Sequence, residues 1–313
     1  MYFQGVCPNN SARLSVYGCR FTARGTLNSG AGSWVTRASF PAPGNLGMSD
    51  GAAVAVGDKI YHIGGHVGDA EKGNVVAASV YVYDTLLDTF TLGPDLPTPL
   101  ARGAGATDGA SMIYYIGGVT TGGVHAGAGG AECMYSLDTA AEGSNATWAA
   151  APCPSTPRSD MCAAWVDGKL YVLGGYNEEF EFLDTVEVYD PATETWADAG
   201  VRLPSGRGDT QCVALGDSIY VVGGITNIDD ATDTQSWFTN EVVEVDVATK
   251  TAEQRAPLPN LARGDVAVAA VSETVMLVAG GERGQSDRTQ VGMHDAVMYD
   301  SLTDTWVRSQ CLP

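Results

Sequence analysis

Short apolar stretches recur along this chain, and each of them ends in a pair of glycines. Almost every residue within a stretch is a β-former, which is typical of a strand buried on both faces. The first glycines of successive pairs are 53, 57, 49 and 57 residues apart, so one structural unit repeats along the chain. The stretches are Ile60–Gly65, Tyr114–Gly118, Leu170–Gly175, Ile219–Gly224 and Met276–Gly281.

The residues around each glycine pair predict three further strands in every unit. Upstream lies an alternating segment such as Met161–Val166, followed by an Asp-Gly or Gly-Asp turn that closes a hairpin. Downstream, a third apolar segment ends in a Tyr-Asp-like pair, and in three units an aromatic residue follows that aspartate by six positions. The glycines allow backbones to approach closely, and the large rings are expected to pack between neighbouring units. The aromatic residues are Phe90, Trp196 and Trp306.

This arrangement resembles the kelch repeat, the unit of a family of β-propellers. The resemblance extends from about residue 48 to the end of the chain and implies an all-β propeller in which each repeat forms one four-stranded blade. Complete blades are predicted at 48–97, 99–150, 155–202, 204–256 and 260–310.

Residues 6–47 contain no glycine pair, and we expect them to close the ring. A six-bladed propeller with a reduced or composite N-terminal blade is favoured, as a single domain over 6–313 with five blades in 48–313. Within the N-terminal segment, 15–17 and 33–35 are predicted to be the third and fourth strands of the extra blade. The alternative is a five-bladed ring with an N-terminal extension. Residues 1–5 are interpreted as the remnant of an expression tag.

The charge balance excludes two classes of partner. The chain has 37 acidic and 17 basic residues, a formal charge of −20. A surface this acidic repels phosphate backbones and anionic lipid, so we expect no binding to nucleic acid. No apolar run approaches the ~20 residues that a membrane helix requires, so no membrane insertion is expected either.

The seven cysteines point to an oxidising compartment. Cys133 and Cys153 are predicted to face each other on the third and fourth strands of one blade and to form a disulfide. Cys162 and Cys212 are predicted on innermost strands, as small buried thiols. The pairing of the remaining three, near the chain ends, stays open: Cys7, Cys19 and Cys311. Two glycosylation triplets, starting at Asn9 and Asn145, also indicate a secreted or lumenal glycoprotein.

Charged residues recur where each blade opens. Blades related by rotation place equivalent residues in a ring around the mouth of the central channel, and residues two apart on a strand share a face. We therefore expect the arginines and aspartates of these motifs to point the same way, as candidate ligand-binding residues. They are Arg102, Arg158, Arg207, Arg263, Asp50, Asp160, Asp209 and Asp265.

Two interpretations of this ring remain open. In the first, arginine and aspartate pair across neighbouring blades and stabilise the packing, because partly buried charges need partners. In the second, the arginines offer planar forks to a carboxylate, a phosphate or an acidic peptide. The kelch resemblance implies the second role, since the adaptor that senses oxidative stress holds acidic peptides in this way. The aspartates depart from that pattern and favour a polar or zwitterionic ligand, or a sugar.

The loops between second and third strands are predicted on the same face as the ring. One of them carries Trp237 and Phe238, an aromatic pair that is interpreted either as a partner contact or as packing at the base of the loop. The histidines have no zinc-ligand spacing, so neither a metal nor a cofactor is expected.

The function predicted from these features is that of a binding or recognition module. We expect a secreted or lumenal kelch propeller that binds a protein partner, or a small polar or anionic ligand, at the channel mouth. The alternative is a non-metal enzyme, similar to an isomerase, mutarotase or lyase, that acts on a sugar-like substrate at the same site. The fold alone does not decide between them.

Overall fold

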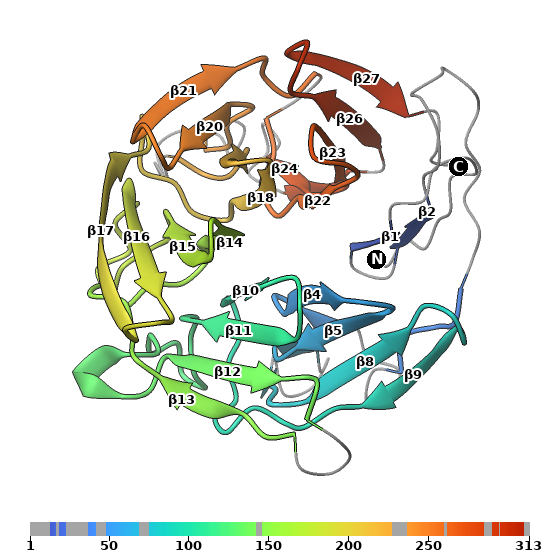
Figure 1. Ribbon diagram of the computed structural model, residues 1–313, viewed down its shortest axis with the longest axis vertical. Helices are drawn as coiled ribbons and strands as arrows, with labels where there is room; N and C mark the ends of the chain where they lie inside the picture. The colour runs from blue at the N-terminus through green and yellow to red at the C-terminus, as the bar shows by residue number, and fades with distance from the viewer. Residues whose placement is uncertain are drawn as a thin grey trace.

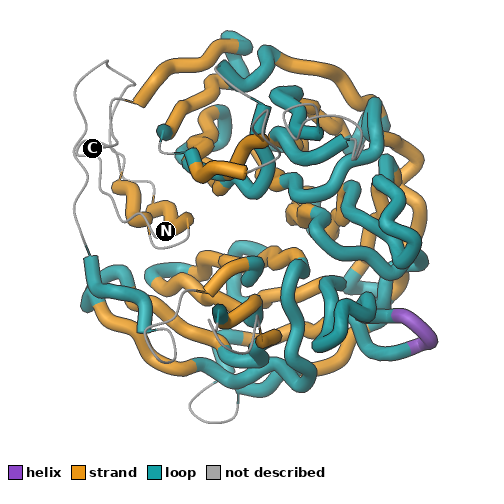
Figure 2. Tube along the Cα trace, turned by 180° about the vertical axis from the view of Figure 1, so that it is seen from behind, coloured by secondary structure: helices purple, strands orange, loops and turns teal. Residues whose placement is uncertain are grey.

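The computed structural model describes residues 37–41, 48–68, 75–141, 146–226, 237–259, 262–284, 290–293 and 295–309, together with two N-terminal strands, β1 (Arg13–Val16) and β2 (Cys19–Thr22). Five four-stranded antiparallel sheets stand in a ring around a central opening (Figure 1). The chain is thus an all-β propeller, and almost all of its described connections are loops (Figure 2).

Each sheet is one blade, and its strands run outward from the centre in chain order. Blade 1 contains β4 (Ala52–Val56), β5 (Lys59–Ile63), β8 (Val80–Asp84) and β9 (Thr89–Leu92). Blade 2 contains β10 (Ala104–Thr107), β11 (Met112–Ile116), β12 (Met134–Asp138) and β13 (Ala149–Ala151). Blade 3 contains β14 (Cys162–Val166), β15 (Lys169–Leu173), β16 (Thr185–Asp190) and β17 (Thr195–Arg202).

The last two complete blades repeat this order. Blade 4 contains β18 (Gln211–Leu215), β19 (Ser218–Val222), β20 (Val242–Asp246) and β21 (Thr251–Arg255). Blade 5 contains β22 (Ala267–Ala270), β23 (Val275–Ala279), β26 (Ala296–Asp300) and β27 (Thr305–Ser309). Short extra strands pair outside the blades: β3 (Met48–Ser49), β6 (His66–Val67) and β7 (Val75–Val76) in one sheet, β24 (Glu282–Gly284) and β25 (Gln290–Gly292) in another.

The glycine pairs join neighbouring blades. Gly117 and Gly118 both have positive φ, at 65° and 90°, which favours glycine. A Cβ added at Gly117 would lie 2.5 Å from the carbonyl oxygen of Arg158 in the next blade, and the N–H of Gly118 donates to that same oxygen at 2.9 Å. The same hydrogen bond recurs from Gly65, Gly175 and Gly224. A side chain at the first glycine would therefore push the next blade away, and one at the second glycine would collide with backbone at the start of its own blade.

The outer aromatic residues provide a second link between blades. The indole N–H of Trp196 donates to the carbonyl of Pro152 at 2.7 Å, and Trp306 donates to Ala256 at 2.8 Å. In both cases the acceptor follows the outermost strand of the preceding blade. Both rings also pack against buried apolar residues. Their predicted position between blades is confirmed.

The N-terminal strands differ from the prediction. β1 pairs with β2 and contacts both β22 and β4, the innermost strands of blades 5 and 1 (Figure 1). It therefore lies beside the innermost strands rather than in the predicted third-strand position, which is further from the channel. The other predicted strand, 33–35, lies outside the described residues.

Residues 37–41 lie against blade 1 in the way that the end of blade 4 lies against blade 5. The N–H of Ala38 donates to Asp88 at 3.0 Å, and the N–H of Ala256 donates to the equivalent Asp304 at 2.8 Å. Ala256 follows the outermost strand of blade 4. The contact of Ala38 is therefore the one that the outer edge of a preceding blade makes.

Two disulfides are present among the described residues. The predicted Cys133–Cys153 bond is confirmed, with Cα atoms 5.5 Å apart. The prediction of free thiols at Cys162 and Cys212 is wrong: these residues form a disulfide with Cα atoms 5.6 Å apart. Their separation of 50 residues is one more than the 49-residue repeat at this place, which brings equivalent strands, β14 and β18, side by side. Cys7 and Cys311 lie outside the described residues, and Cys19 lies on β2.

Candidate functional site

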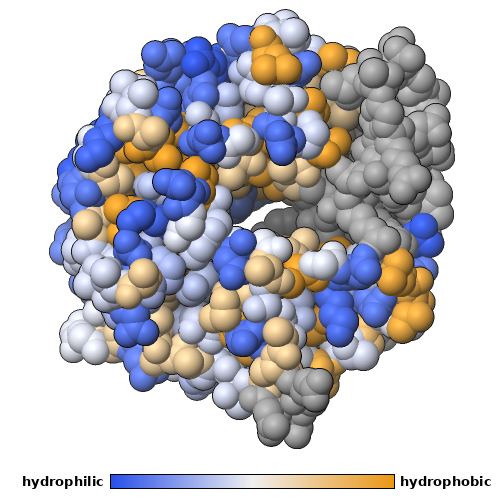
Figure 3. All heavy atoms as spheres, viewed as in Figure 1, coloured by the Kyte–Doolittle hydropathy of each residue, from blue (hydrophilic) through white to orange (hydrophobic). Residues whose placement is uncertain are grey.

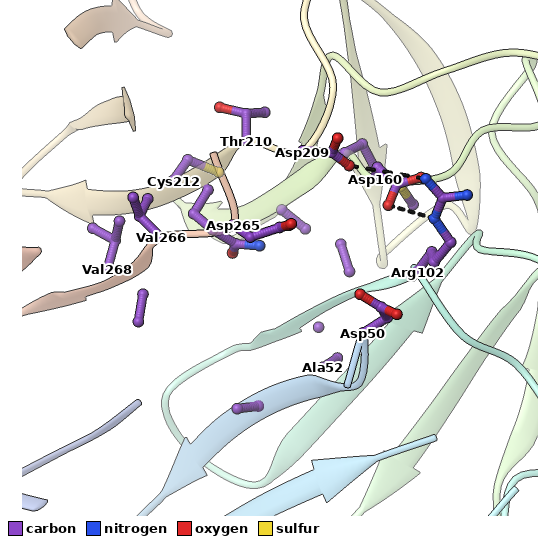
Figure 4. Close-up of a pocket in the computed structure, with 18 of the residues that line it drawn as sticks. Asp50, Ala52, Arg102, Asp160, Asp209, Thr210, Cys212, Asp265, Val266 and Val268 are labelled. Atoms are coloured by element: carbon purple, nitrogen blue, oxygen red, sulfur yellow. Dashed lines mark hydrogen bonds and ion pairs between the residues drawn. The ribbon is translucent and has the colours of Figure 1, made fainter. Parts of the chain in front are cut away.

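A cavity of about 140 Å³ lies at the mouth of the central channel, and the ring is visibly hollow there (Figure 3). Its walls are the innermost strands of the five blades and the residues that precede those strands. Alanine, glycine and valine make up most of the wall. The charged residues that line it are Asp50, Arg102, Asp160, Asp209 and Asp265 (Figure 4).

These five charged residues occupy equivalent places in the five blades. The residue before each of them pairs with the segment after a glycine pair, as in the bridges from Ser159 to Tyr176 and from Ala101 to Val119. The residues themselves all have left-handed backbone, with φ between 48° and 61°. Backbone hydrogen bonds also run from one to the next, including those from Arg102 N–H to the Asp50 carbonyl and from Asp160 N–H to the Arg102 carbonyl, both at 2.8 Å. We call this set the mouth ring.

The other three arginines do not face the channel, so the prediction that they do is wrong. Arg158, Arg207 and Arg263 each have 0 % of their surface exposed. Each extends into its own blade and pairs there with a carboxylate on the third strand or just before it. The alternation on which the prediction rested fails because a left-handed residue interrupts the strand, so residues two apart no longer share a face.

The alignment of Arg102 with these arginines is wrong as well. The carbonyl of Leu100, not of Arg102, accepts the N–H of the preceding blade's second glycine, as the carbonyls of Arg158 and Arg207 do. Leu100 is therefore the residue equivalent to the buried arginines, and Arg102 takes the place of the aspartates. Of the two open interpretations, pairing across blades holds for Arg102 with Asp160, whereas the buried arginines pair within their blades.

The sequence analysis missed the carboxylates that partner the buried arginines. Arg158 pairs with Glu187, which is 5 % exposed, and Glu187 also accepts hydrogen bonds from the N–H and hydroxyl of Ser155 at 2.7 Å. Arg207 pairs with Glu241 and Arg263 with Asp295, each at 2.6 Å.

A comparison of the repeats contains the signal for two of these pairs, in blades 4 and 5; in blade 3 the equivalent residue is Thr185, and Glu187 lies two positions later. The carbonyls of Glu241 and Asp295 accept the N–H of the first glycine in their blades, as those of Cys133 and Ser79 do in blades 2 and 1. Where the arginine is absent, at Leu100, the acidic residue is absent too. The arginine and its carboxylate are therefore a unit that is present or missing as a whole.

Within the mouth ring, blades 2, 3 and 4 form one connected polar cluster. The Nε of Arg102 donates to Asp160 Oδ1 at 2.8 Å, and its NH2 lies 4.0 Å from Asp209 Oδ1 (Figure 4). The Ser159 hydroxyl donates to Asp160 Oδ2 at 2.6 Å, and the Tyr176 hydroxyl donates to Asp209 Oδ2 at 3.1 Å. One guanidinium thus serves two carboxyl groups from different blades.

The proximity of these carboxyl groups changes their protonation. Burial and the neighbouring Asp160 raise the pKa of Asp209 to about 8, against the opposing effect of Arg102. Burial also raises the pKa of Asp160, although Arg102 and Ser159 lower it. Burial opposes the charge of Arg102, but Asp160, Asp209 and Asp50 outweigh it and raise the pKa of Arg102. At neutral pH Asp209 therefore holds a proton, so that its carboxyl group can act as a hydrogen-bond donor beside Asp160.

Asp265 and Asp50 complete the ring on the other side of the cavity. Enclosure by the channel wall and the nearby carboxylates raise the pKa of Asp265, whose side chain remains open to the channel. The Oδ2 of Asp50 lies 2.9 Å from His66 Nδ1. The Nε2 of His125 lies 3.1 Å from the Ser159 hydroxyl, and burial lowers the pKa of His125. Within the described ranges, no three histidine, cysteine or acidic side chains are grouped to bind a metal.

The two residues predicted as partner contacts separate in the structure. Phe238 is 6 % exposed, forms a β-bridge with Ile225 and packs against Gly264, so it does not offer the exposed contact that was predicted. Trp237 is partly exposed and stays a prediction. The sequence analysis missed Phe180, which is 65 % exposed and has a φ of 58°, on the loop that follows Tyr176.

Comparison with known proteins defines the family. The model of the KLHDC2/KLHL20/DRC7 kelch-repeats domain matches residues 50–227 and 106–312. The chain therefore belongs to the kelch-repeat family of β-propellers. Among the described residues, no helix is both long enough and apolar enough to cross a membrane.

Curated relatives include enzymes. The chain is 33% identical over 150 residues to the N-acetylneuraminate epimerase of Haemophilus influenzae (strain PittEE), covering 44% of this chain and 36% of the relative. It is 32% identical over 136 residues to the N-acetylneuraminate epimerase of Escherichia coli (strain K12), covering 42% of this chain and 34% of the relative. The chain thus spans only about a third of the length of these relatives.

Proposed function

We propose that this propeller binds a small, polar, hydroxyl-rich ligand such as a saccharide at its channel mouth. The observation that carries the proposal is the mouth ring: four carboxyl groups and one guanidinium, at five equivalent left-handed positions, surround one cavity. Left-handed backbone costs an arginine or aspartate on the order of 1 kcal/mol, and such strain is concentrated at functional sites.

The chemistry of the ring favours hydroxyl groups over anions. The ring has four acidic groups against one basic group, so a carboxylate or phosphate finds only Arg102 as a favourable partner. A hydroxyl group both donates and accepts, and the Asp160–Asp209 pair offers one acceptor and one proton. The cavity of about 140 Å³ is smaller than a typical drug site of ~300–1,000 Å³, which favours a small ligand.

A secreted or lumenal location supports this assignment. Two disulfides in a chain of this size are typical of an oxidising compartment. Free saccharides and glycan ends are abundant polar ligands in such compartments. A protein partner that presents a glycan satisfies the same site, with Trp237 as a candidate contact beside it.

A second candidate is an enzyme that transfers protons on a sugar-like substrate. Two observations favour it: a carboxyl group that is protonated at neutral pH beside a second carboxyl group, and relatives that are named epimerases. A protonated Asp209 is a candidate general acid because burial and Asp160 raise its pKa, and Asp160, which pairs with Arg102, is a candidate general base. Neither group needs a metal for this chemistry.

Calorimetric titration of neutral sugars, amino sugars and sugar acids tests the proposal. Wild-type protein should bind at least one class, and Asp209→Asn and Arg102→Gln should weaken binding by roughly tenfold or more, the effect of removing one charged hydrogen-bond partner. Asp217→Asn, on the exposed turn between β18 and β19, is the control and should bind normally. No binding by wild type, or equal binding by all variants, would contradict the proposal.

The same ligands distinguish binding from catalysis. Proton NMR of the bound sugar records whether its anomers or epimers interconvert faster than in buffer. Acceleration that is lost in Asp209→Asn assigns an enzyme. Binding without acceleration assigns a recognition module.

A further inference from the structure

The Cys162–Cys212 disulfide joins the two strands that follow the carboxyl pair of the mouth ring. Cys162 begins β14 two residues after Asp160, and Cys212 is the second residue of β18, three residues after Asp209. Cys212 itself lines the cavity (Figure 4). The only covalent bond between blades in the described part of the chain therefore joins the two strands that carry Asp160 and Asp209.

The equivalent positions at the other blade interfaces hold no cysteine. Strand register identifies these positions. Cys162 pairs with Leu173, the residue just before the glycine pair of its blade. Ala52 and Ala104 pair in the same way with Ile63 and Ile116, so they are the equivalents of Cys162 in blades 1 and 2. The position of Cys212 corresponds in the same way to Gly105 and Ala163. The resulting interface pairs are Ala52 with Gly105, Ala104 with Ala163, and Gln211 with Val268.

These equivalent positions approach one another without a bond. A Cβ added at Gly105 would lie 3.0 Å from the Cβ of Ala52. Small side chains therefore close the interface between blades 1 and 2. At the interface between blades 3 and 4 a disulfide takes the place of these small residues, and the two strands that it joins follow Asp160 and Asp209.

We propose that the Cys162–Cys212 disulfide is a positioning element of the channel-mouth site, which holds the carboxyl groups of Asp160 and Asp209 next to each other and to Arg102. This inference rests on the proposed function for its effect on ligand binding, but not for its effect on the carboxyl pair. Without the bond, Arg102 still reaches Asp160 at 2.8 Å and Asp209 at 4.0 Å, and the Gly175 N–H still donates to the Arg207 carbonyl deeper in the interface. The ends of the innermost strands are then free to move apart, which lets both carboxyl groups ionise more readily.

The experiment compares two double variants of the full chain. Cys162→Ala/Cys212→Ala gives this interface the same small residues as Ala104 and Ala163. Cys133→Ala/Cys153→Ala is the matched control, because that bond lies inside blade 2 and away from the ring. Carbon-13 NMR of labelled aspartate side chains follows the titration in both, and Asp209→Asn identifies the signal of the pair.

The expected result is specific to the bond between blades. In wild type and in the control, one carboxyl group of the pair should titrate at about pH 8. In Cys162→Ala/Cys212→Ala that midpoint should fall by about one pH unit or more, since separated carboxyl groups no longer oppose each other's ionisation. An unchanged midpoint in this variant would overturn the inference.

A relocated bond covers the case in which the variant folds poorly. Adding Ala104→Cys and Ala163→Cys to Cys162→Ala/Cys212→Ala places a covalent link at the neighbouring interface. This protein should recover its melting temperature but keep the lowered midpoint. Recovery of the wild-type midpoint would show that any covalent link suffices and would also overturn the inference. A failure of wild type to bind sugars contradicts the proposed function alone, because the titration needs no ligand.

Discussion

Arg158 and Arg102 each begin the short motif that opens their blade, yet they occupy opposite environments. Arg158 is completely buried in blade 3, where Glu187 neutralises it. Arg102 lies at the channel mouth with a third of its side chain exposed and shares two carboxyl groups with neighbouring blades. A shift of two residues relative to the left-handed position separates the roles. Arginine before that position belongs to the scaffold, and arginine at that position belongs to the site.

The two regions also solve the burial of charge in different ways. Inside the blade, one arginine meets one carboxylate, and both are absent together in blades 1 and 2. At the mouth, acidic groups outnumber the single arginine. The raised pKa values of Asp209 and Asp265 favour their protonation, which reduces the excess of negative charge. The first arrangement is suited to stability and the second to exchange of protons or ligands.

The largest effect is expected from Arg158→Leu. This change leaves Glu187 buried without its cation and should lower the free energy of unfolding by roughly 3–5 kcal/mol, as measured by urea denaturation. Its control copies blade 2, where Leu100 and Tyr135 occupy these two places: Arg158→Leu with Glu187→Tyr should be clearly more stable than Arg158→Leu. Equal losses in the two proteins would show that the arginine and its carboxylate are not a unit.

The next effect separates two aromatic residues on the face of the channel mouth. Phe238→Ala removes a buried ring that packs on Gly264 and should cost about 3 kcal/mol. Phe180→Ala removes a mostly exposed ring and should change stability by less than about 0.5 kcal/mol. Thermal melts of both variants check this. A large loss for Phe180→Ala would mean that its loop is part of the packed scaffold.

The pH dependence of stability should carry the signature of Asp209. Its pKa is about 8 in the folded protein and about 3.9 when unfolded, so the folded state holds a proton that the unfolded chain releases. This contribution is complete below pH ~4, and it is lost as the pH rises towards ~8. Wild type should therefore lose more stability between pH 5 and pH 8 than Asp209→Asn does. Parallel curves for the two proteins would contradict a shared proton.

The smallest effect is expected at the arginine of the mouth ring. Arg102→Asn removes an ion pair with Asp160, but asparagine tolerates the φ of 61° and Asp160 can take up a proton instead. Stability should change by no more than about 1 kcal/mol, in contrast to Arg158→Leu. Denaturation curves at pH 6 measure the difference. A loss as large as that of Arg158→Leu would remove the distinction between site and scaffold.

The repeat made the fold predictable, because strand period, glycine pairs and turn residues agree in five copies. The links made by Trp196 and Trp306 and the Cys133–Cys153 bond followed from strand order alone. The pairing of β1 with β2 did not, because the N-terminal segment has no glycine pair to place it in the repeat. The Cys162–Cys212 bond was missed although its spacing is close to one repeat. The strand pattern within a blade predicts which residues face each other in that blade, but not which residues meet between two blades.

The aspartates of the mouth ring were predicted from the sequence, whereas three of the four arginines were wrongly predicted to belong to it. Strand alternation predicts that Arg158 and Asp160 share a face, but the left-handed backbone at Asp160 turns the two side chains apart. No residue-by-residue pattern predicts that conformation for an aspartate. The acidic partners of the buried arginines were also missed, because Glu187 lies a whole strand away in the sequence.

A crystal structure with bound saccharide tests the central claim most directly. Crystals are soaked with the sugar that binds most tightly in calorimetry, and electron density is sought across the whole surface. The ligand should lie at the channel mouth, with its hydroxyl groups within hydrogen-bond distance of Arg102, Asp209 and Asp160. Density on an outer blade surface with an empty channel would contradict the claim that the mouth ring is the binding site.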